Sequence, residues 1–240
     1  MGQDVRLELL PGLLLVVGIA AVIRGGSGWM IFRRSIYKEL YSNYFEYAMR
    51  RKSIFRLSKS YYLESRFGAH RIYYQLAAVK GKQPQAYVVV LLTSGMYILN
   101  IKNQTGDIEA ALNGDFRYES VKKGKRGESL HIEVKKMKNP LEETAYFRAK
   151  ILDKLKNERM QVRSLVVFPD ASTLKWKNKK EPEKYSVIHR RDVYRALKAL
   201  HESREQTLGE TDIDRIYLTL AGDVLEAEKR ENEFLQKGGE

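Results

Sequence analysis

Two adjacent apolar runs near the middle of the chain predict a buried β-hairpin. Tyr87–Leu92 is a continuous run of aromatic, β-branched and aliphatic residues, and Met96–Lys102 is a second apolar run that ends on a lysine. Thr93–Gly95, between the two runs, has the residue types of a tight turn. Because neither run alternates with polar residues, we expect both faces of this sheet to be covered. Lys102 is then unusual, since a charged side chain at the end of a buried strand is rarely placed there for packing.

Other apolar patterns predict further strands and helices around this hairpin. Alternating or short apolar runs predict strands over residues 116–121, 130–134, 164–168 and 185–188, the first two as an exposed hairpin. Helical spacing predicts helices over residues 35–65, 67–79, 139–158, 190–203 and 211–236. Gly106-Asp107 is a turn signal, and residues 173–184 form a Lys-rich loop in this prediction. The pattern predicts an α/β or α+β fold with a sheet core flanked by helices.

An uncharged apolar segment near the N-terminus predicts a membrane anchor. Leu9–Ile23 has no charged residue over its fifteen positions, whereas a bilayer-spanning helix usually needs about 20 residues. Tilt, bilayer thinning and snorkelling of Arg24 can close this gap, with Trp29 at the interface. One alternative is a cleaved signal peptide, although the segment lacks a basic start and a clean cleavage site. The other alternative is a buried core helix.

The distribution of charge predicts the orientation of this anchor. Seven basic residues follow the apolar segment: Arg24, Arg33, Arg34, Lys38, Arg50, Arg51 and Lys52. The positive-inside rule then predicts a single-pass protein of the cell membrane, with its C-terminal domain in the cytoplasm. The chain has no cysteine, which excludes disulfides and thiolate metal sites and fits a cytoplasmic domain.

The formal net charge of +13 favours anionic partners such as nucleic acid, anionic lipid or an acidic protein. The densest positive patch is in and around the loop of the exposed hairpin, and we predict that it binds phosphate or lipid, with a solvated loop as the alternative. Its residues are Lys122, Lys123, Lys125, Arg126, Lys135, Lys136 and Lys138. The last predicted helix is acidic instead. It could dock on the domain or on a protein partner, but we favour a solvated helix on the surface.

Short motifs add a family resemblance to these patterns. Gln85-Ala86-Tyr87 begins the first strand of the central hairpin. Gly95–Ile108 then has a glycine, an apolar strand, Asn100-Ile101-Lys102-Asn103 and a further glycine. Asn139-Pro140 starts a helix later in the chain. This order, over about residues 60–200, resembles the NERD family (nuclease-related domain), which is similar to the PD-(D/E)XK nucleases. The resemblance implies a restriction-endonuclease-like α/β sandwich with a mixed central sheet flanked by helices.

The departures from the family pattern concern its catalytic residues. Tyr87 stands where the family has Asp, Asn100 where it has Glu, and Glu143 where it has Gln, while the family's helix Glu falls near His70. Only Lys102 matches. Such nucleases hold Mg²⁺ with carboxylates, and the metal and the lysine activate water. We therefore predict a degenerate centre without a metal cofactor, in which Lys102 is a relic of the old site or simply pairs with Glu143 or another acid.

These predictions together describe a membrane-anchored, cytoplasm-facing NERD-like protein that binds nucleic acid or another anionic partner. Its predicted parts are an anchor at 1–34, a basic Tyr-rich juxtamembrane helix at 35–66, a NERD-like domain at 67–205 and an acidic helix at 206–240. One alternative function is a non-catalytic scaffold at the membrane. Another is an active Mg²⁺-dependent nuclease with migrated carboxylates, for which the candidates are Glu64, Asp107, Asp115 and Glu143.

Overall fold

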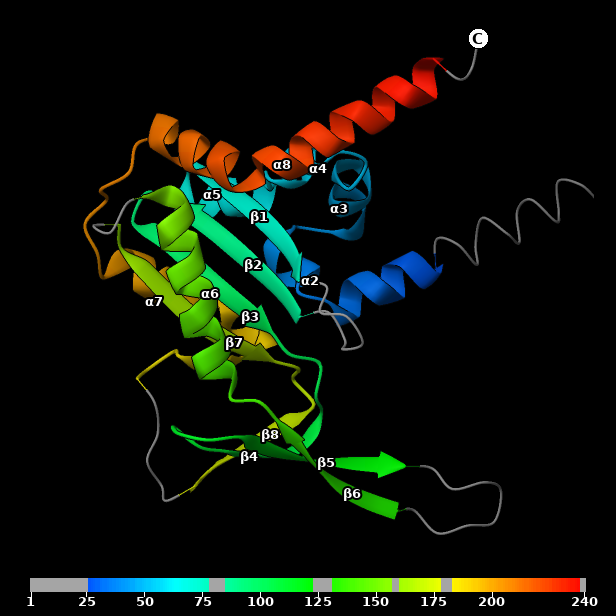
Figure 1. Cartoon of the computed structure of the whole chain (residues 1–240), viewed down its shortest axis with the longest axis vertical. Coiled ribbons are helices and arrows are strands. Elements are labelled where there is room, and N and C mark those ends of the chain that lie inside the picture. The colour runs from blue at the N-terminus through cyan, green and yellow to red at the C-terminus, as the bar shows by residue number, and fades with distance from the viewer. Residues whose placement is uncertain (1–25, 78–84, 123–130, 157–159, 178–182, 238–240) are drawn as a thin grey trace, which may run out of the picture.

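A five-stranded mixed sheet forms the centre of the protein (Figure 1). Its strands, in spatial order, are β1 (His70–Ala77), β2 (Gln85–Leu92), β3 (Gly95–Ile101), β7 (Val162–Phe168) and β9 (Val187–His189). The first three strands are antiparallel, whereas β3, β7 and β9 run parallel. The predicted central hairpin is thus confirmed as β2–β3, and the strands predicted over 164–168 and 185–188 are confirmed as β7 and β9.

The computed structural model describes residues 26–77, 85–122, 131–156, 160–177 and 183–237. The apolar segment Leu9–Ile23 lies outside these ranges, so the predicted anchor stays a prediction. Of the helices in the described ranges, none combines the length and the apolar character needed to cross a bilayer.

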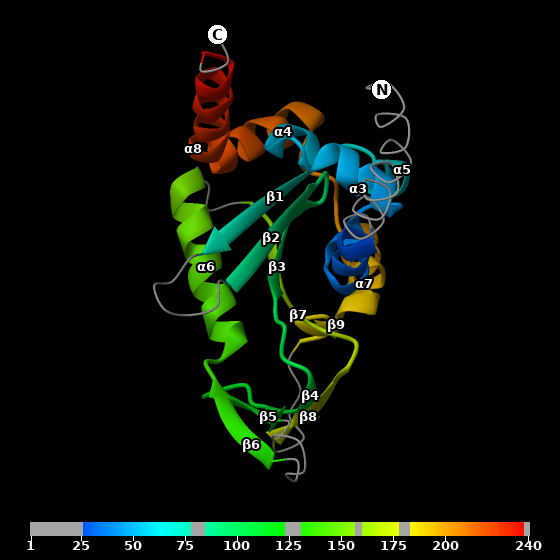
Figure 2. The ribbon, with the colours of Figure 1, turned by 90° about the vertical axis from the view of Figure 1, so that its right-hand side faces the viewer.

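Helices cover both faces of the central sheet, as the apolar runs predicted (Figure 2). On one face, Met96 and Ile98 of β3 pack with α6 (Pro140–Leu155) and α8 (Glu210–Lys237). On the other face, Tyr97 and Leu99 pack with the N-terminal helices and α7 (Val193–Glu202). The alternation of side chains along a strand sends these neighbours to opposite faces. The fold is therefore α/β, with a helical layer on each side of a mixed sheet.

A second, four-stranded sheet continues from the first one, below it in Figure 1. Its strands, in spatial order, are β6 (His131–Met137), β5 (Phe116–Lys122), β4 (Gly106–Ala110) and β8 (Ser172–Trp176). The chain passes from β3 to β4 and from β7 to β8. These two segments therefore lie side by side in both sheets, as the parallel pair β3–β7 in the first and the parallel pair β4–β8 in the second. The predicted exposed hairpin is confirmed as β5–β6.

The helix predicted over residues 67–79 is wrong, because residues 70–77 form strand β1. Apolar residues four positions apart share one face of a helix, but they also share one face of a strand, so the spacing fits both elements. Residues 70–77 pair with β2 in the register His70↔Leu92. Cross-strand pairing, which connects distant residues, decided between the two periodicities.

The single helix predicted over 35–65 is also wrong. The structure has four short helices there: α2 (Tyr37–Leu40), α3 (Tyr44–Arg50), α4 (Ile54–Leu57) and α5 (Tyr61–Phe67). Capping residues cause two of the breaks, since Asn43 Oδ1 accepts from the Glu46 amide at 2.9 Å and Ser60 Oγ accepts from the Tyr62 amide at 3.1 Å. Tyr41, Tyr47 and Leu63 from this segment are buried against the sheet.

Two smaller predictions need correction. The loop predicted over 173–184 begins as strand β8, and the turn predicted at Gly106-Asp107 is the start of β4. These two strands pair with each other in parallel although they are far apart in the sequence. The residues within each segment alone therefore do not indicate a strand. The other helices are confirmed as α6, α7 and α8, with a 3₁₀ turn at Arg190–Asp192 before α7.

The acidic helix α8 docks on the domain through its first half. Ile213, Tyr217 and Leu220 are buried on the sheet face that α6 also covers. Asp214 forms an ion pair with the buried Arg71 of β1, with 2.6 Å between Oδ1 and Nε. Docking on the domain is thus confirmed for this half, where the favoured prediction of a solvated surface helix is wrong; a protein partner for α8 stays a prediction.

Candidate functional site

Lys102 lies where the chain leaves β3 for the second sheet, and it is only 4 % exposed. Its ammonium donates a hydrogen bond of 2.6 Å to Oε2 of Glu143, in the first turn of α6. The two side chains are 5 % and 11 % exposed, so the ion pair is largely withdrawn from solvent. The structural alternative for Lys102, pairing with Glu143, is confirmed.

The start of α6 places Glu143 beside the lysine. Asn139 caps this helix, because its Oδ1 accepts from the Leu141 amide at 3.0 Å, and Pro140 occupies the first turn where a missing N–H costs nothing. The Nδ2 group of Asn139 donates to the Leu112 carbonyl at 3.1 Å and so ties the cap to the chain after β4. Glu143 follows in the first turn, where a carboxylate complements the helix dipole.

Burial and pairing act on Lys102 in opposite directions. Removal from water lowers the pKa of Lys102, while the hydrogen bond and the charge of Glu143 raise it, and the net shift is downward. An ammonium with one buried carboxylate as its partner is held in one place by that partner. The pair thus connects β3 to α6 and does not present a free lysine to solvent.

Asn100 is fully buried two residues before Lys102 and faces the same helix. Its Nδ2 group donates to the Pro140 carbonyl at 3.2 Å and to Thr144 Oγ1 at 2.9 Å. Thr144 in turn donates to the Pro140 carbonyl at 2.6 Å. The Oδ1 atom of Asn100 has no hydrogen-bond partner among the residues that the structure describes. This amide therefore fastens the first turn of α6 to the centre of the sheet.

Tyr87 lies directly across from Asn100 on the neighbouring strand β2. Its ring stacks on Phe147 of α6, with 4.0 Å between the ring centroids and 17° between the planes. Its hydroxyl donates a long hydrogen bond of 3.4 Å to the Glu143 carbonyl. Burial, together with the charge of Glu143, raises the pKa of Tyr87 to about 12, so the phenol is neutral at physiological pH.

The structure thus brings four of the motif residues together around the start of α6: Tyr87, Asn100, Lys102 and Glu143. It does not bring His70 to them. The register of β1 pairs His70 with Leu92, at the opposite end of the sheet from Lys102. There, His70 accepts a hydrogen bond from the Ser60 amide and contacts the Gly68 carbonyl.

A family model for the nuclease-related domain matches residues 48–169, just over half of the chain and including all four of these residues. The chain belongs to the NERD family. The predicted resemblance is confirmed. The match begins within the segment predicted as a juxtamembrane helix, whose boundaries stay a prediction. No curated protein and no solved structure matches the chain.

The migrated carboxylates that an active NERD nuclease would need are dispersed. Glu64 on α5 lines a small pocket with His70, at the far end of the sheet. Asp107 forms an ion pair with Lys175 across β4 and β8. Asp115 lies in the connection from β4 to β5. Glu143 is the candidate that reaches Lys102, and its carboxylate is already engaged there.

The groups around Lys102 do not fit a Mg²⁺ ion. A hard divalent cation prefers several oxygen ligands that include carboxylates. Around the start of α6 the protein offers a carboxylate held by an ammonium, a neutral phenol and an amide. Within the described ranges, no group of three or more His, Asp or Glu side chains could hold a metal ion.

The basic residues predicted to bind anions lie on the second sheet. Lys122 ends β5, and Lys135 and Lys136 belong to β6. Lys136 and Lys138 are exposed, whereas Lys135 is half-buried and lies 3.8 Å from Glu133. Lys123, Lys125 and Arg126 are outside the described residues. Binding by this group stays a prediction.

Thr144 and Phe147, which contact Asn100 and Tyr87, are not among the residues predicted from the sequence. The buried positions of α6 are Pro140, Thr144, Phe147 and Ile151, whereas its apolar residue Ala145 is exposed. Spacing of three to four residues from Pro140 is the signal that could have found them.

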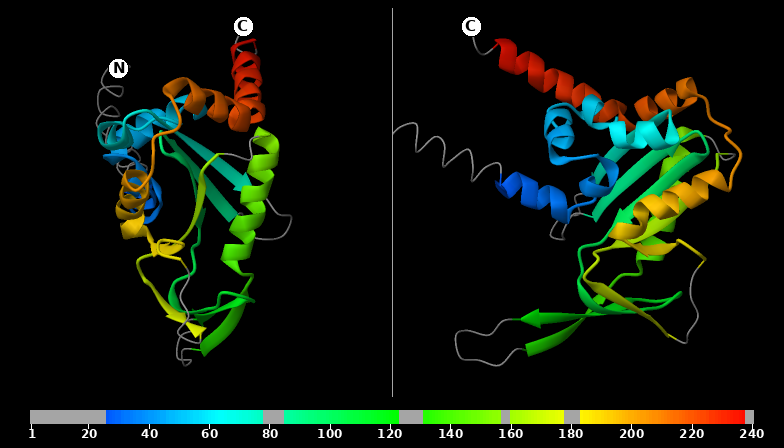
Figure 3. Two further views of the ribbon diagram at one scale, coloured as in Figure 1. Left: turned by 90° about the vertical axis from the view of Figure 1, so that its left-hand side faces the viewer. Right: turned by 180° about the vertical axis from the view of Figure 1, so that it is seen from behind.

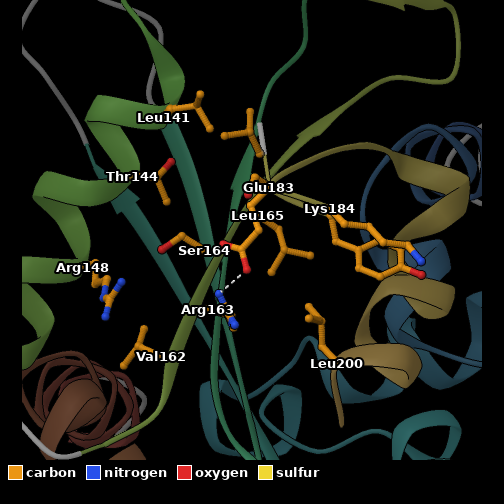
Figure 4. A pocket seen from close by; sticks show the side chains of 13 residues that line it. Leu141, Thr144, Arg148, Val162, Arg163, Ser164, Leu165, Glu183, Lys184 and Leu200 are labelled. Carbon is orange, nitrogen blue, oxygen red and sulfur yellow. Dashed lines mark hydrogen bonds and ion pairs between the residues drawn. The ribbon is translucent and has the colours of Figure 1, made fainter. Parts of the chain in front are cut away.

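A cavity of about 160 Å³ lies next to this site, between α6, the edge of β7 and the segment before β9 (Figure 4). It shares Thr144 with the site and is also lined by Arg148, Ser164 and the Arg163–Glu183 ion pair, whose charged atoms are 2.7 Å apart. Lys102 is not among its lining residues. The cavity is therefore separate from the lysine.

Proposed function

We propose that this NERD protein is a membrane-anchored, cytoplasm-facing protein with a degenerate nuclease centre, which binds an anionic partner through its basic second sheet. The observation that carries the degenerate centre is the buried ion pair between Lys102 and Glu143. The strand order and the helical layers on both faces support a restriction-endonuclease-like sandwich as its fold.

Hydrolysis of a phosphodiester by such a centre requires a metal ion to stabilise charge and a lysine that can reach the attacking water. The Lys102 ammonium is directed at Glu143 and is withdrawn from solvent. Tyr87 and Asn100, at the carboxylate positions, hold Phe147 and the first turn of α6 instead. The former catalytic positions thus act as structural contacts between sheet and helix.

The anchor and the orientation are proposed from the sequence. Leu9–Ile23 is uncharged, and basic residues follow it closely. A single span with the α/β domain in the cytoplasm satisfies both features. The excess of positive charge then faces anionic partners, and Lys136 and Lys138 are exposed for contact with them.

A nuclease assay on the full chain in mild detergent tests the degenerate centre. The substrates are single- and double-stranded DNA and RNA with Mg²⁺ or Mn²⁺. The test variant is Lys102→Met with Glu143→Leu, which replaces both charges by apolar groups so that neither is left unpaired. The matched control is Lys175→Ala, which removes a strand lysine that pairs with Asp107 on the surface.

We expect no cleavage above background for the wild-type protein or for either variant. Cleavage by the wild type and by Lys175→Ala that disappears in the double variant would overturn the proposal. In that case the centre would be active with relocated ligands. Thermal unfolding of each variant checks that the domain is folded in the assay.

A further inference from the structure

The end of the β5–β6 hairpin where β5 ends and β6 begins projects from the same side of the molecule as the helix over residues 26–34. They point to the right in Figure 1 and to the left in the rear view of Figure 3. The segment Leu9–Ile23 precedes this helix in the sequence. A membrane that holds this segment would therefore lie on the side toward which the hairpin extends.

The hairpin carries large apolar side chains on its solvent face. Ile132 and Val134 of β6 are 64 % and 62 % exposed. Residues alternate along the strand, so these two share a face with the exposed Lys136, while Met137 points into the core of the second sheet. Arg117 of β5 pairs in register with Lys136 and is also exposed. The apolar residues thus lie toward the end where β6 begins, and the two basic residues lie closer to the rest of the second sheet.

This order fits the interface of an anionic bilayer. Apolar side chains that enter the acyl boundary, followed by Lys or Arg at the level of the headgroups, are typical of segments that lie in the interface. Two acidic residues share this face: Glu119 lies opposite Val134, and Glu109 of β4 lies opposite Arg117. Nucleic acid fits less well, because bases stack on aromatic side chains and these two exposed residues are aliphatic.

The helix over 26–34 and α3 lie on the side of the molecule toward which the hairpin projects, and they too expose large apolar side chains. Trp29, Ile31, Phe45 and Met49 are exposed. Arg33 lies over the Trp29 ring, 4.7 Å from its centroid. Tryptophan with arginine is a combination found at membrane interfaces. The C-terminal end of α8 also projects to this side in Figure 1, and its sequence from Glu226 to Lys237 has four glutamates against three basic residues.

We propose that the β5–β6 hairpin is a second membrane contact, in which Ile132 and Val134 enter the interface and Lys136 and Arg117 bind anionic headgroups. The proposal rests on the proposed anchor, which brings the bilayer to this side. The hairpin then sets the orientation of the domain relative to the membrane surface.

The absence of cysteine allows a direct test on the full chain. Ile132→Cys receives an environment-sensitive fluorophore, and the control is Tyr146→Cys, an exposed position on α6. Each labelled chain is reconstituted into vesicles of phosphatidylcholine, with or without phosphatidylglycerol. Quenching by spin-labelled lipid reports contact with the bilayer, and quenching by iodide reports contact with water. Flotation of the vesicles reports the anchor separately.

We expect the probe at 132 to be quenched by lipid and shielded from iodide when phosphatidylglycerol is present, and the probe at 146 to show the reverse. Adding Lys136→Glu and Arg117→Glu should lower the ratio of bound to free hairpin at least about tenfold. A probe at 132 that stays open to iodide in chains that float overturns the hairpin contact and leaves the anchor intact. Chains that do not float overturn the anchor, and the hairpin contact with it. A response of the probe to a DNA or RNA oligonucleotide, but not to phosphatidylglycerol, assigns the hairpin to nucleic acid and overturns the proposal.

Discussion

Lys102, directly after β3, and Glu143 of α6 are 41 positions apart in the sequence and meet at 2.6 Å in a site almost closed to solvent. The pair stands at the position where related nucleases hold a catalytic lysine, as the family resemblance implies. The partner of the lysine, Glu143, is in the first turn of α6, and Asn100 fastens this same turn to the sheet. The contact therefore determines both the packing of α6 and the availability of the lysine.

Removing one member of this pair should be costly. We expect Lys102→Ala to lower the free energy of unfolding by about 3–5 kcal/mol, because Glu143 is left charged and buried. The double variant Lys102→Met with Glu143→Leu should recover most of the loss. Lys175→Ala, at a pair whose side chains are 65 % and 41 % exposed, should cost no more than about 1 kcal/mol. Denaturant unfolding measures all three, and equal costs for the two alanine variants would contradict the buried ion pair.

Asn100→Asp should destabilise the protein in a pH-dependent way. The substitution removes the donor to the Pro140 carbonyl and to Thr144, and it buries a carboxyl group, at a cost of about 2–4 kcal/mol at pH 7. Burial should raise the folded-state pKa of the new carboxyl above its unfolded value. The folded state then binds more protons, so the loss of stability relative to wild type should grow as the pH rises from 4 to 7.

The matched control for this variant is Asn103→Asp, three residues away and exposed. Its stability should follow that of the wild type across the same pH range. A flat difference between Asn100→Asp and wild type would show that the new carboxyl is solvated and that α6 does not seal the site.

Asp214→Asn should loosen α8 from the sheet. Arg71 is buried and donates to both carboxylate oxygens of Asp214, at 2.6 and 3.1 Å. We expect a loss of about 2–4 kcal/mol in the free energy of unfolding, because a buried guanidinium loses its charged partner and keeps only the hydrogen bond to Ser58 and the contacts with Phe55 and Tyr217. Asp223→Asn is the control; its carboxylate pairs with Lys154 but is 90 % exposed, so the loss should stay below about 1 kcal/mol. Hydrogen exchange should show faster opening of α8 in the first variant alone.

The same pair predicts an acid limit to stability. The hydrogen bond from Arg71 lowers the pKa of Asp214 below its usual value. Its contribution is therefore complete above the unfolded carboxyl pKa and is lost as the pH falls through the lower, folded-state value. Wild-type protein should lose more stability than Asp214→Asn between pH 5 and the acid transition. Parallel pH curves for the two proteins would contradict this.

His70 predicts a second pH effect, closer to neutrality. Its Nε2 accepts from the Ser60 amide at 2.9 Å, so the other nitrogen donates to the Gly68 carbonyl, and the ring is neutral. Burial lowers the pKa of His70. The unfolded state then binds more protons, so stability should fall as the pH drops below about 6.5, toward the folded-state pKa.

The variant His70→Gln can keep an acceptor for the Ser60 amide and removes the titrating ring, so it should flatten this part of the curve. His189→Gln, at the end of β9, is the control and should keep the wild-type slope. Thermal unfolding between pH 5 and 8 measures both. Identical slopes for wild type and His70→Gln would assign the effect to another group.

Some elements of this structure were predictable from short stretches of the sequence alone. The β2–β3 hairpin was predictable because two apolar runs and a turn lie within 22 consecutive residues, from Tyr87 to Ile108. The start of α6 was predictable from Asn139-Pro140, since capping involves only neighbouring residues. The NERD resemblance was likewise contained in short spacings around Asn100 and Lys102. In each case the residues that allow the prediction belong to the same short segment as the feature that they predict.

Contacts between distant segments decided the rest. Residues 70–77 became β1 because β2 offered a partner edge, and β4 and β8 became strands through each other, 66 positions apart at Gly106 and Ser172. Likewise, the sequence left open whether Lys102 meets a phosphate or an acid, and only the docking of α6 selected Glu143. Periodicity cannot decide such cases, because the stabilising partner of each residue lies elsewhere in the chain.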